Sequence, residues 1–102
     1  MLELRPTCEH CNKALPPAAT DARICSFECT FCANCVETVL FNVCPNCGGG
    51  FVPRPVRPAT AWKDEAHLGK QPASTQVKHR PVEPAAHGIF SARLRTIPPE
   101  QR

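Results

Sequence analysis

The stretch that decides the fold is Cys25-Ser26-Phe27-Glu28-Cys29-Thr30-Phe31-Cys32-Ala33-Asn34-Cys35, which holds half of the chain's cysteines. Working outward, one more pair precedes it and another follows, and each of these pairs is separated by two residues. Two thiolates at this spacing can hold one tetrahedral ion from a tight turn, with metal–sulfur distances of about 2.3 Å. Two such pairs complete a closed site, so the eight cysteines predict two Zn²⁺ ions per chain. The predicted metal ligands are Cys8, Cys11, Cys25, Cys29, Cys32, Cys35, Cys44 and Cys47.

Three other uses of paired cysteines compete with this interpretation. Disulfides suit an even count, but short pairs in a chain without a secretory signal more often bind metal. A redox pair requires a thioredoxin-like βαβ unit, and the sequence shows no such pattern. Cys29, Cys32 and Cys35 have ferredoxin spacing, but Val39 stands where the fourth cluster ligand is expected. Zinc is therefore favoured, and an iron–sulfur cluster is the main alternative.

The residues around the cysteines predict short elements. Residues 22–25 and 28–31 are expected to be two strands around a turn, and residues 33–43 a helix. The helix prediction rests on apolar residues at i, i+3, i+4 and i+7, with Thr30 or Asn34 as its cap and Asn42 as its terminator. Gly48 and Gly49 follow the last cysteine pair, where a knuckle needs positive φ. A strand pair, a helix and a knuckle around a metal make a small α+β, treble-clef-like unit.

Composition divides the chain into two parts. Residues 1–52 form the expected two-zinc module, and residues 53–102 form a basic, proline-rich tail that is expected to be flexible and disordered. Eight of the 12 prolines lie from Pro53 onward. Residues 1–50 have a net charge of −2 and residues 51–102 a net charge of +5. Two zinc ions bound by eight thiolates would make the module still more acidic.

The predicted apolar core is thin, since only 42% of the residues are hydrophobic and 6% aromatic. A module of this size rarely folds on such a core alone, whereas a structural zinc site contributes on the order of 10–16 kcal/mol. We therefore expect the module to be unfolded without metal. No apolar run is long enough to span a bilayer and the start lacks the apolar region of a secretory signal, so a cytoplasmic location is expected.

The whole ladder, from Cys25 to Cys35 and on to Cys44-Pro45-Asn46-Cys47, resembles a RING-type zinc finger. That resemblance implies interleaved pairing of the ligands. Cys8, Cys11, Cys32 and Cys35 would then hold one zinc ion, and Cys25, Cys29, Cys44 and Cys47 the other. A sequential arrangement, with the first four and the last four cysteines as separate sites, is the alternative, and spacing alone does not exclude it.

A closer resemblance covers residues 1–58. The blocks at residues 2–8, 22–32 and 44–49 are similar to domain-of-unknown-function family 1272, a family of short bacterial proteins. This resemblance implies a small zinc-binding fold and no known activity.

These features predict a non-enzymatic zinc-binding module that mediates protein interaction. One alternative is nucleic-acid binding through the tail cations, since the acidic module is a poor surface for phosphates. Another is a RING-type ubiquitin ligase: Pro45 and the helical Leu40 and Phe41 fit, but Gly48 stands where a basic residue is needed.

His10, between two ligands, is expected beside the metal site or exposed, and the tail histidines are expected in solvent. Residues 60–68, around Trp62, are expected to form a short helix, and the apolar segment 87–98 a short docking segment.

Overall fold

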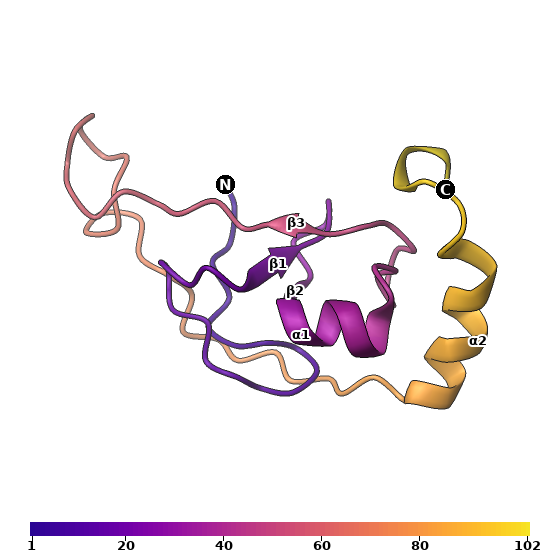
Figure 1. The fold of residues 1–102 in the computed structure, drawn as a ribbon. Coiled ribbons are helices and arrows are strands. Elements are labelled where there is room, and N and C mark those ends of the chain that lie inside the picture. Colours follow the sequence, from indigo (N-terminus) through magenta and orange to yellow (C-terminus); the bar gives the residue numbers. More distant parts are fainter.

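The computed structural model describes all residues 1–102 (Figure 1). A three-stranded antiparallel sheet has the order β2-β1-β3. Its strands are β1 (Ala22–Ile24), β2 (Thr30–Cys32) and β3 (Val52–Pro53). One helical segment, α1 (Ala33–Cys35) continued by the π-helical η1 (Val36–Leu40), follows β2 directly. Helix α2 (Pro84–Leu94) and the 3₁₀ turn η2 (Pro99–Gln101) lie at the other end of the elongated molecule from the loop that follows β3.

The strand pair forms a hairpin close to the predicted positions. Ala22 pairs with Cys32 and Ile24 with Thr30, which leaves residues 25–29 as the turn. Glu28 has a φ of 68° there. All three residues of β2 are buried, because the segment around Glu9 covers its outer edge: the Glu9 N–H donates to the Thr30 carbonyl at 2.9 Å.

The helix is shorter than the predicted 33–43. It ends at Leu40, because Phe41 and Asn42 adopt left-handed backbone conformations with φ of 54° and 56°. Asn42 does help to end it, and its Oδ1 accepts a hydrogen bond from the N–H of Phe51 at 2.9 Å. Neither expected cap is used, since the N-cap residue is Cys32 and it makes no side-chain cap bond.

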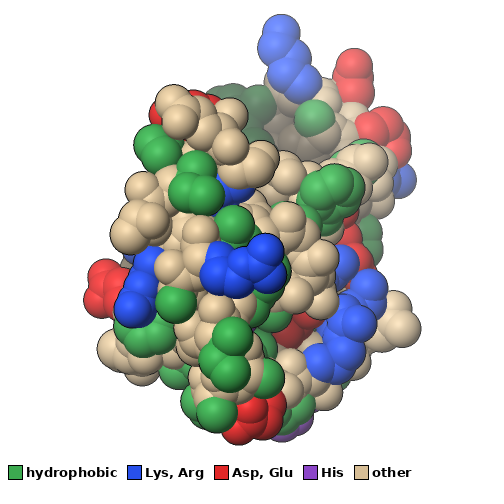
Figure 2. Space-filling model, turned by 90° about the vertical axis from the view of Figure 1, so that its right-hand side faces the viewer, with side chains coloured by type: hydrophobic (Ala, Val, Ile, Leu, Met, Phe, Trp, Pro, Cys, Tyr) green, Lys and Arg blue, Asp and Glu red, His purple; other side chains and the backbone are tan.

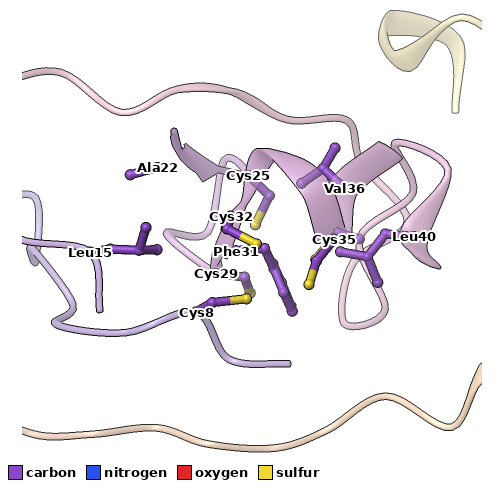
Figure 3. Packing of buried hydrophobic residues seen from close by; sticks show 11 residues of the cluster. Cys8, Leu15, Ala22, Cys25, Cys29, Phe31, Cys32, Cys35, Val36 and Leu40 are labelled. Atoms are coloured by element: carbon purple, nitrogen blue, oxygen red, sulfur yellow. The ribbon is translucent and has the colours of Figure 1, made fainter. Parts of the chain in front are cut away.

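The core of the module is built largely of cysteines. Six of the eight cysteines belong to the buried cluster, together with Leu15, Phe31 and Leu40 among others. Figure 3 shows the Phe31 ring among these cysteine side chains. Phe51 packs edge-on against Phe31, with ring centroids 5.5 Å apart. Phe27, although apolar, lies in the hairpin turn and is 71% exposed.

The prediction of a disordered tail is not supported by the structure. Proline and the Glu83 carboxylate start α2, where the Glu83 Oε2 accepts from the Ala86 N–H at 2.6 Å. His87 is buried rather than solvated, and its Nε2 lies 2.9 Å from the Leu40 carbonyl. This hydrogen bond joins α2 to the end of η1, a long-range contact that composition cannot reveal.

Other parts of the tail also differ from expectation. Residues 60–68 form bends and turns instead of a helix, and Trp62 is 78% exposed.

On the face that carries α2, hydrophobic, basic and acidic side chains are interspersed (Figure 2). None of the helices is both long enough and apolar enough to cross a bilayer.

Candidate metal centres

The first group of cysteines joins the first knuckle, Cys8–Cys11, to the junction of β2 and α1. The sulfur atoms of Cys8, Cys11, Cys32 and Cys35 all lie within 4.8 Å of one another. Cys11 Sγ and Cys32 Sγ are 3.8 Å apart. Four sulfurs placed tetrahedrally at about 2.3 Å from a metal are separated by about 3.8 Å, whereas a disulfide bond is about 2.05 Å long. The four side chains thus have the spacing of a tetrahedral thiolate site.

The second group joins the hairpin turn to the second knuckle, Cys44–Cys47. The sulfur atoms of Cys25, Cys44 and Cys47 lie within 4.8 Å of one another. Cys29 lies beside this set, with its side chain close to those of Cys25 and Cys44, but its sulfur is not within 4.8 Å of all three others. Its sulfur also accepts a hydrogen bond from Asn46 Nδ2 at 3.3 Å.

The two groups interleave along the chain, as the RING resemblance implies. The first and third pairs meet in one group, and the second and fourth pairs in the other. The sequential arrangement is therefore not the one that the structure adopts. Cys11 in one group and Cys47 in the other are exposed, and the remaining six cysteines are buried.

Several N–H groups point at the sulfurs. The Phe27 N–H donates to Cys25 Sγ and the Gly49 N–H to Cys47 Sγ, each at 3.3 Å. Gly48, with a φ of 77°, makes this turn possible, as its position in the sequence predicts. N–H donors stabilise the thiolate form, which is the form that binds metal. Sequence reasoning missed the donor Asn46, because nothing in its pattern distinguishes it from an exposed turn residue.

Burial of the cysteine side chains favours the neutral thiol, whereas the N–H donors favour the thiolate. Burial raises the pKa values of Cys29, Cys35 and Cys44, and charge repulsion from neighbouring thiolates raises them further. A thiolate in such surroundings needs a compensating charge. A divalent cation supplies it for a whole group, so the donor set, its spacing and its electrostatics all fit a soft, tetrahedral ion such as Zn²⁺.

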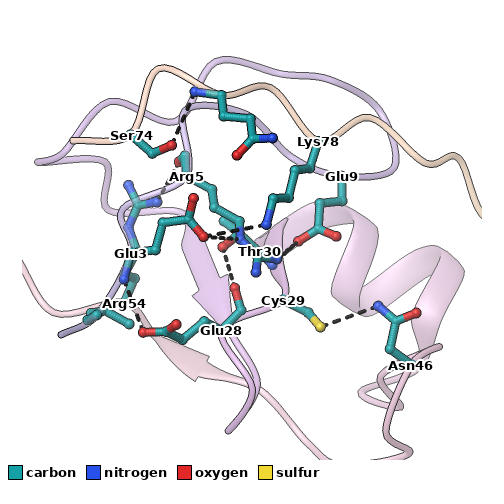
Figure 4. A network of polar contacts seen from close by, with 12 residues as sticks. Glu3, Arg5, Glu9, Glu28, Cys29, Thr30, Asn46, Arg54, Ser74 and Lys78 are labelled. Atoms are coloured by element: carbon teal, nitrogen blue, oxygen red, sulfur yellow. Dashed lines mark hydrogen bonds and ion pairs between the residues drawn. The ribbon is translucent and has the colours of Figure 1, made fainter.

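A buried carboxylate fixes the first knuckle to the sheet (Figure 4). Glu9 lies between two cysteines of the first group and is only 1% exposed. Its Oε2 accepts from Arg5 Nη1 at 2.7 Å and from the Thr30 N–H at 2.6 Å. This clamp holds the Cys8–Cys11 knuckle beside β2, so the two halves of the first group meet. A charged residue between ligands is expected to be exposed, so the sequence gives no sign of this role.

Arg54 is a second buried charge that sequence reasoning misplaced. As part of the basic tail it was expected in solvent, and only the nucleic-acid alternative would place it against phosphates, but it is 4% exposed. Its Nη1 donates to the Arg5 carbonyl, and its Nη2 to the carbonyls of Leu15 and Pro16, at 2.9 to 3.0 Å. Burial lowers the pKa of Arg54. The guanidinium therefore ties the start of the tail to the segment between the first two cysteine pairs.

Other tail cations also turn toward the module. Arg57 donates to the carbonyls of Leu2 and Gln71, both at 2.6 Å. Lys78 lies 3.6 Å from Glu3 and Arg80 3.4 Å from Glu9. The basic tail therefore neutralises part of the acidic module.

His10 also joins the module to the tail. Its Nδ1 accepts a hydrogen bond from the Val82 N–H at 2.8 Å, and its carbonyl lies 3.0 Å from His79 Nε2. Neither contact is with a sulfur atom, so His10 acts here as a tail anchor.

Fold and site define a small cysteine-rich α+β protein with two clusters of cysteines that could bind metal ions. The chain belongs to the family described as protein of unknown function (DUF1272), whose profile matches residues 1–57. It is 60% identical over 75 residues to an uncharacterized protein of Rhizobium meliloti (strain 1021), covering 74% of this chain and 82% of that one. No solved structure matches this chain, so the RING-like and treble-clef descriptions stay predictions.

Proposed function

We propose that the eight cysteines bind two Zn²⁺ ions as structural ions, and that the protein is a non-enzymatic, RING-like interaction module. The observation that carries this proposal is the interleaving of the two sulfur groups. Each group joins segments that are far apart in sequence, so two bound ions fix the relative positions of both knuckles, the hairpin and the helix. With so little apolar core, this cross-linking is the main source of order.

The closed donor sets support a structural rather than a catalytic role. A zinc ion held by four thiolates has no open position for water or substrate. A module of this kind acts by presenting a surface, so a protein partner is the function that we propose.

The tail contacts argue against the nucleic-acid alternative. Arg54 and Arg57 bond to backbone carbonyls, while Lys78 and Arg80 lie beside carboxylates of the module. Cations used in this way are less available for phosphate contacts, which supply most non-specific affinity.

Cobalt substitution tests the metal proposal. The metal-free chain should take up two equivalents of Co²⁺ and develop the visible and near-ultraviolet bands of tetrahedral thiolate coordination. Zn²⁺ should then displace the cobalt and remove the bands. Saturation at a single equivalent, or spectra of octahedral Co²⁺, would contradict the proposal.

A further inference from the structure

A cavity of about 380 Å³ lies where the tail passes over the module. Glu9, Phe31 and Asn46 line it from the module, and Arg80, His87 and Phe90 from the tail. Its size lies within the range of ligand pockets in proteins. Neither of the proposed zinc ions would occupy it, since none of its lining residues is a cysteine.

One oxygen of the buried Glu9 carboxylate is poorly satisfied. Oε2 accepts two short hydrogen bonds, but the sole contact of Oε1 within the protein is Arg80 Nη2 at 3.4 Å. This contact is long, and it is open to solvent because the Arg80 side chain is 67% exposed. A carboxylate that is 1% exposed gains more from a second short, charge-assisted hydrogen bond than from this contact.

Two more groups in the lining have lone pairs without a partner in the protein. His87 Nε2 faces the Leu40 carbonyl and must carry the proton there, which leaves Nδ1 as an acceptor in the neutral ring. Asn46 gives its amide hydrogen to Cys29 Sγ, and its Oδ1 makes no hydrogen bond within the protein. The polar part of the lining is therefore rich in acceptors.

The surroundings favour a positive charge. Glu83 adds a second carboxylate to the lining, where Arg80 is the one cation, although Arg5 behind the lining already pairs with Oε2 of Glu9. Phe31 and Phe90 contribute aromatic rings, which attract cations at their faces. Asn46 also connects the cavity to the second sulfur group, which would have a net charge of −2 once four thiolates hold Zn²⁺.

We infer that this cavity receives a basic side chain, arginine or lysine, of a partner protein. The inference deepens the proposed function and rests on it, because the cavity forms only when the chain is folded around its zinc ions. In the free protein, the Arg80 guanidinium occupies the position beside Glu9 Oε1 that the partner's basic group would take. Its backbone N–H donates to the Glu9 carbonyl at 2.8 Å, so its guanidinium can swing out while its backbone stays in place.

An NMR titration of the full-length, zinc-loaded chain tests the inference. The probes are N-acetylarginine amide and N-acetyllysine amide, with N-acetylleucine amide as the uncharged control. Saturable shifts of the amide signals of Glu9, Asn46 and His87 are expected with the two basic probes. Equal shifts with the leucine derivative, or no shifts with any probe, would overturn the inference.

Variants sharpen the test. Arg80→Ala removes the competing cation and should tighten arginine binding, whereas Phe90→Leu should weaken it by roughly threefold or more. Glu83→Gln should also weaken it, and it leaves the Glu9 clamp of the fold intact. Glu37→Gln is the matched control on the outer side of η1, and it should bind like the unchanged chain. Unchanged affinity in Arg80→Ala, or preferential binding of 1,4-diaminobutane over the arginine probe, would contradict a partner side chain.

Metal content separates the two proposals. If the chain contains two zinc ions and a dispersed spectrum but ignores the basic probes, the cavity inference fails and the zinc proposal stands. If the chain contains no zinc, it is the proposed function that fails.

Discussion

The sulfur atoms of Cys11 and Cys32 lie 3.8 Å apart, although these residues are 21 positions apart in sequence. This separation is too long for a disulfide and matches the edge of a tetrahedron of thiolates around one ion. It also shows that the knuckle before the hairpin shares a site with the end of the hairpin. The interleaved arrangement therefore makes predictions that a sequential arrangement would not.

Paired substitutions distinguish the two arrangements. Cys11→Ser with Cys35→Ser removes two ligands of one group and should lose one zinc ion per chain. Cys11→Ser with Cys25→Ser removes one ligand from each group and should weaken both sites, whereas in a sequential arrangement it would remove two ligands of the same site. Elemental analysis and competition with a chromogenic chelator measure the stoichiometry and affinity. Retention of one tight zinc ion in the second variant and loss of both in the first would contradict the interleaving.

Metal removal should unfold the module. The buried core consists largely of cysteines, so chelation leaves too little apolar burial to offset the conformational entropy of the chain. The amide signals of residues 1–52 are expected to collapse into the narrow range of an unfolded chain and to return when Zn²⁺ is added. A chain that keeps its dispersed signals after complete metal removal would show that the apolar core suffices.

The Glu9 clamp should contribute strongly to stability. Glu9→Gln leaves the buried Arg5 guanidinium with the more exposed Glu3 as its one remaining carboxylate, and losing the buried partner should cost on the order of 2 kcal/mol. Urea unfolding of the zinc-saturated chain measures the difference in the free energy of unfolding. Glu37→Gln, an exposed change, should differ from the unchanged chain by less than about 0.5 kcal/mol. Equal midpoints for both variants would mean that the clamp has no role.

Helix α2 should be held mainly by His87. His87→Ala removes the hydrogen bond that joins α2 to the Leu40 carbonyl, which keeps only the Val43 N–H as a donor, and it removes a buried side chain, so α2 should open more often. Hydrogen exchange of the α2 amides should then be faster by about tenfold, at unchanged zinc content. Ile89→Ala is the matched control in the same helix, since Ile89 is 73% exposed, and its exchange should be unaltered. Faster exchange in both variants alike would point to helix propensity instead.

The cysteines that gather in the two groups can be predicted from the sequence, and the residues that hold the segments together cannot. Cysteine spacing indicates the ligands, the hairpin and the helix that follows, because each knuckle needs a local turn of defined length. Glu9 and Arg54 could not be placed, because a charged side chain is normally exposed and their burial depends on carbonyls and N–H groups from distant segments.

The tail shows the same limit. Its prolines and charges are typical of a flexible segment, and it forms little regular structure before α2. Its order comes from single long-range hydrogen bonds, such as Val82 N–H to His10 Nδ1, which leave no periodic pattern in the sequence. The end of the helix at Leu40 likewise depends on backbone conformations at Phe41 and Asn42 that an apolar repeat does not reveal.

The most direct test of the central claim is the metal content of the purified, full-length chain, measured by elemental analysis against its protein concentration. Two zinc ions per chain, in a colourless preparation, is the predicted result. A folded chain without bound metal, or a brown preparation that contains iron, would contradict it.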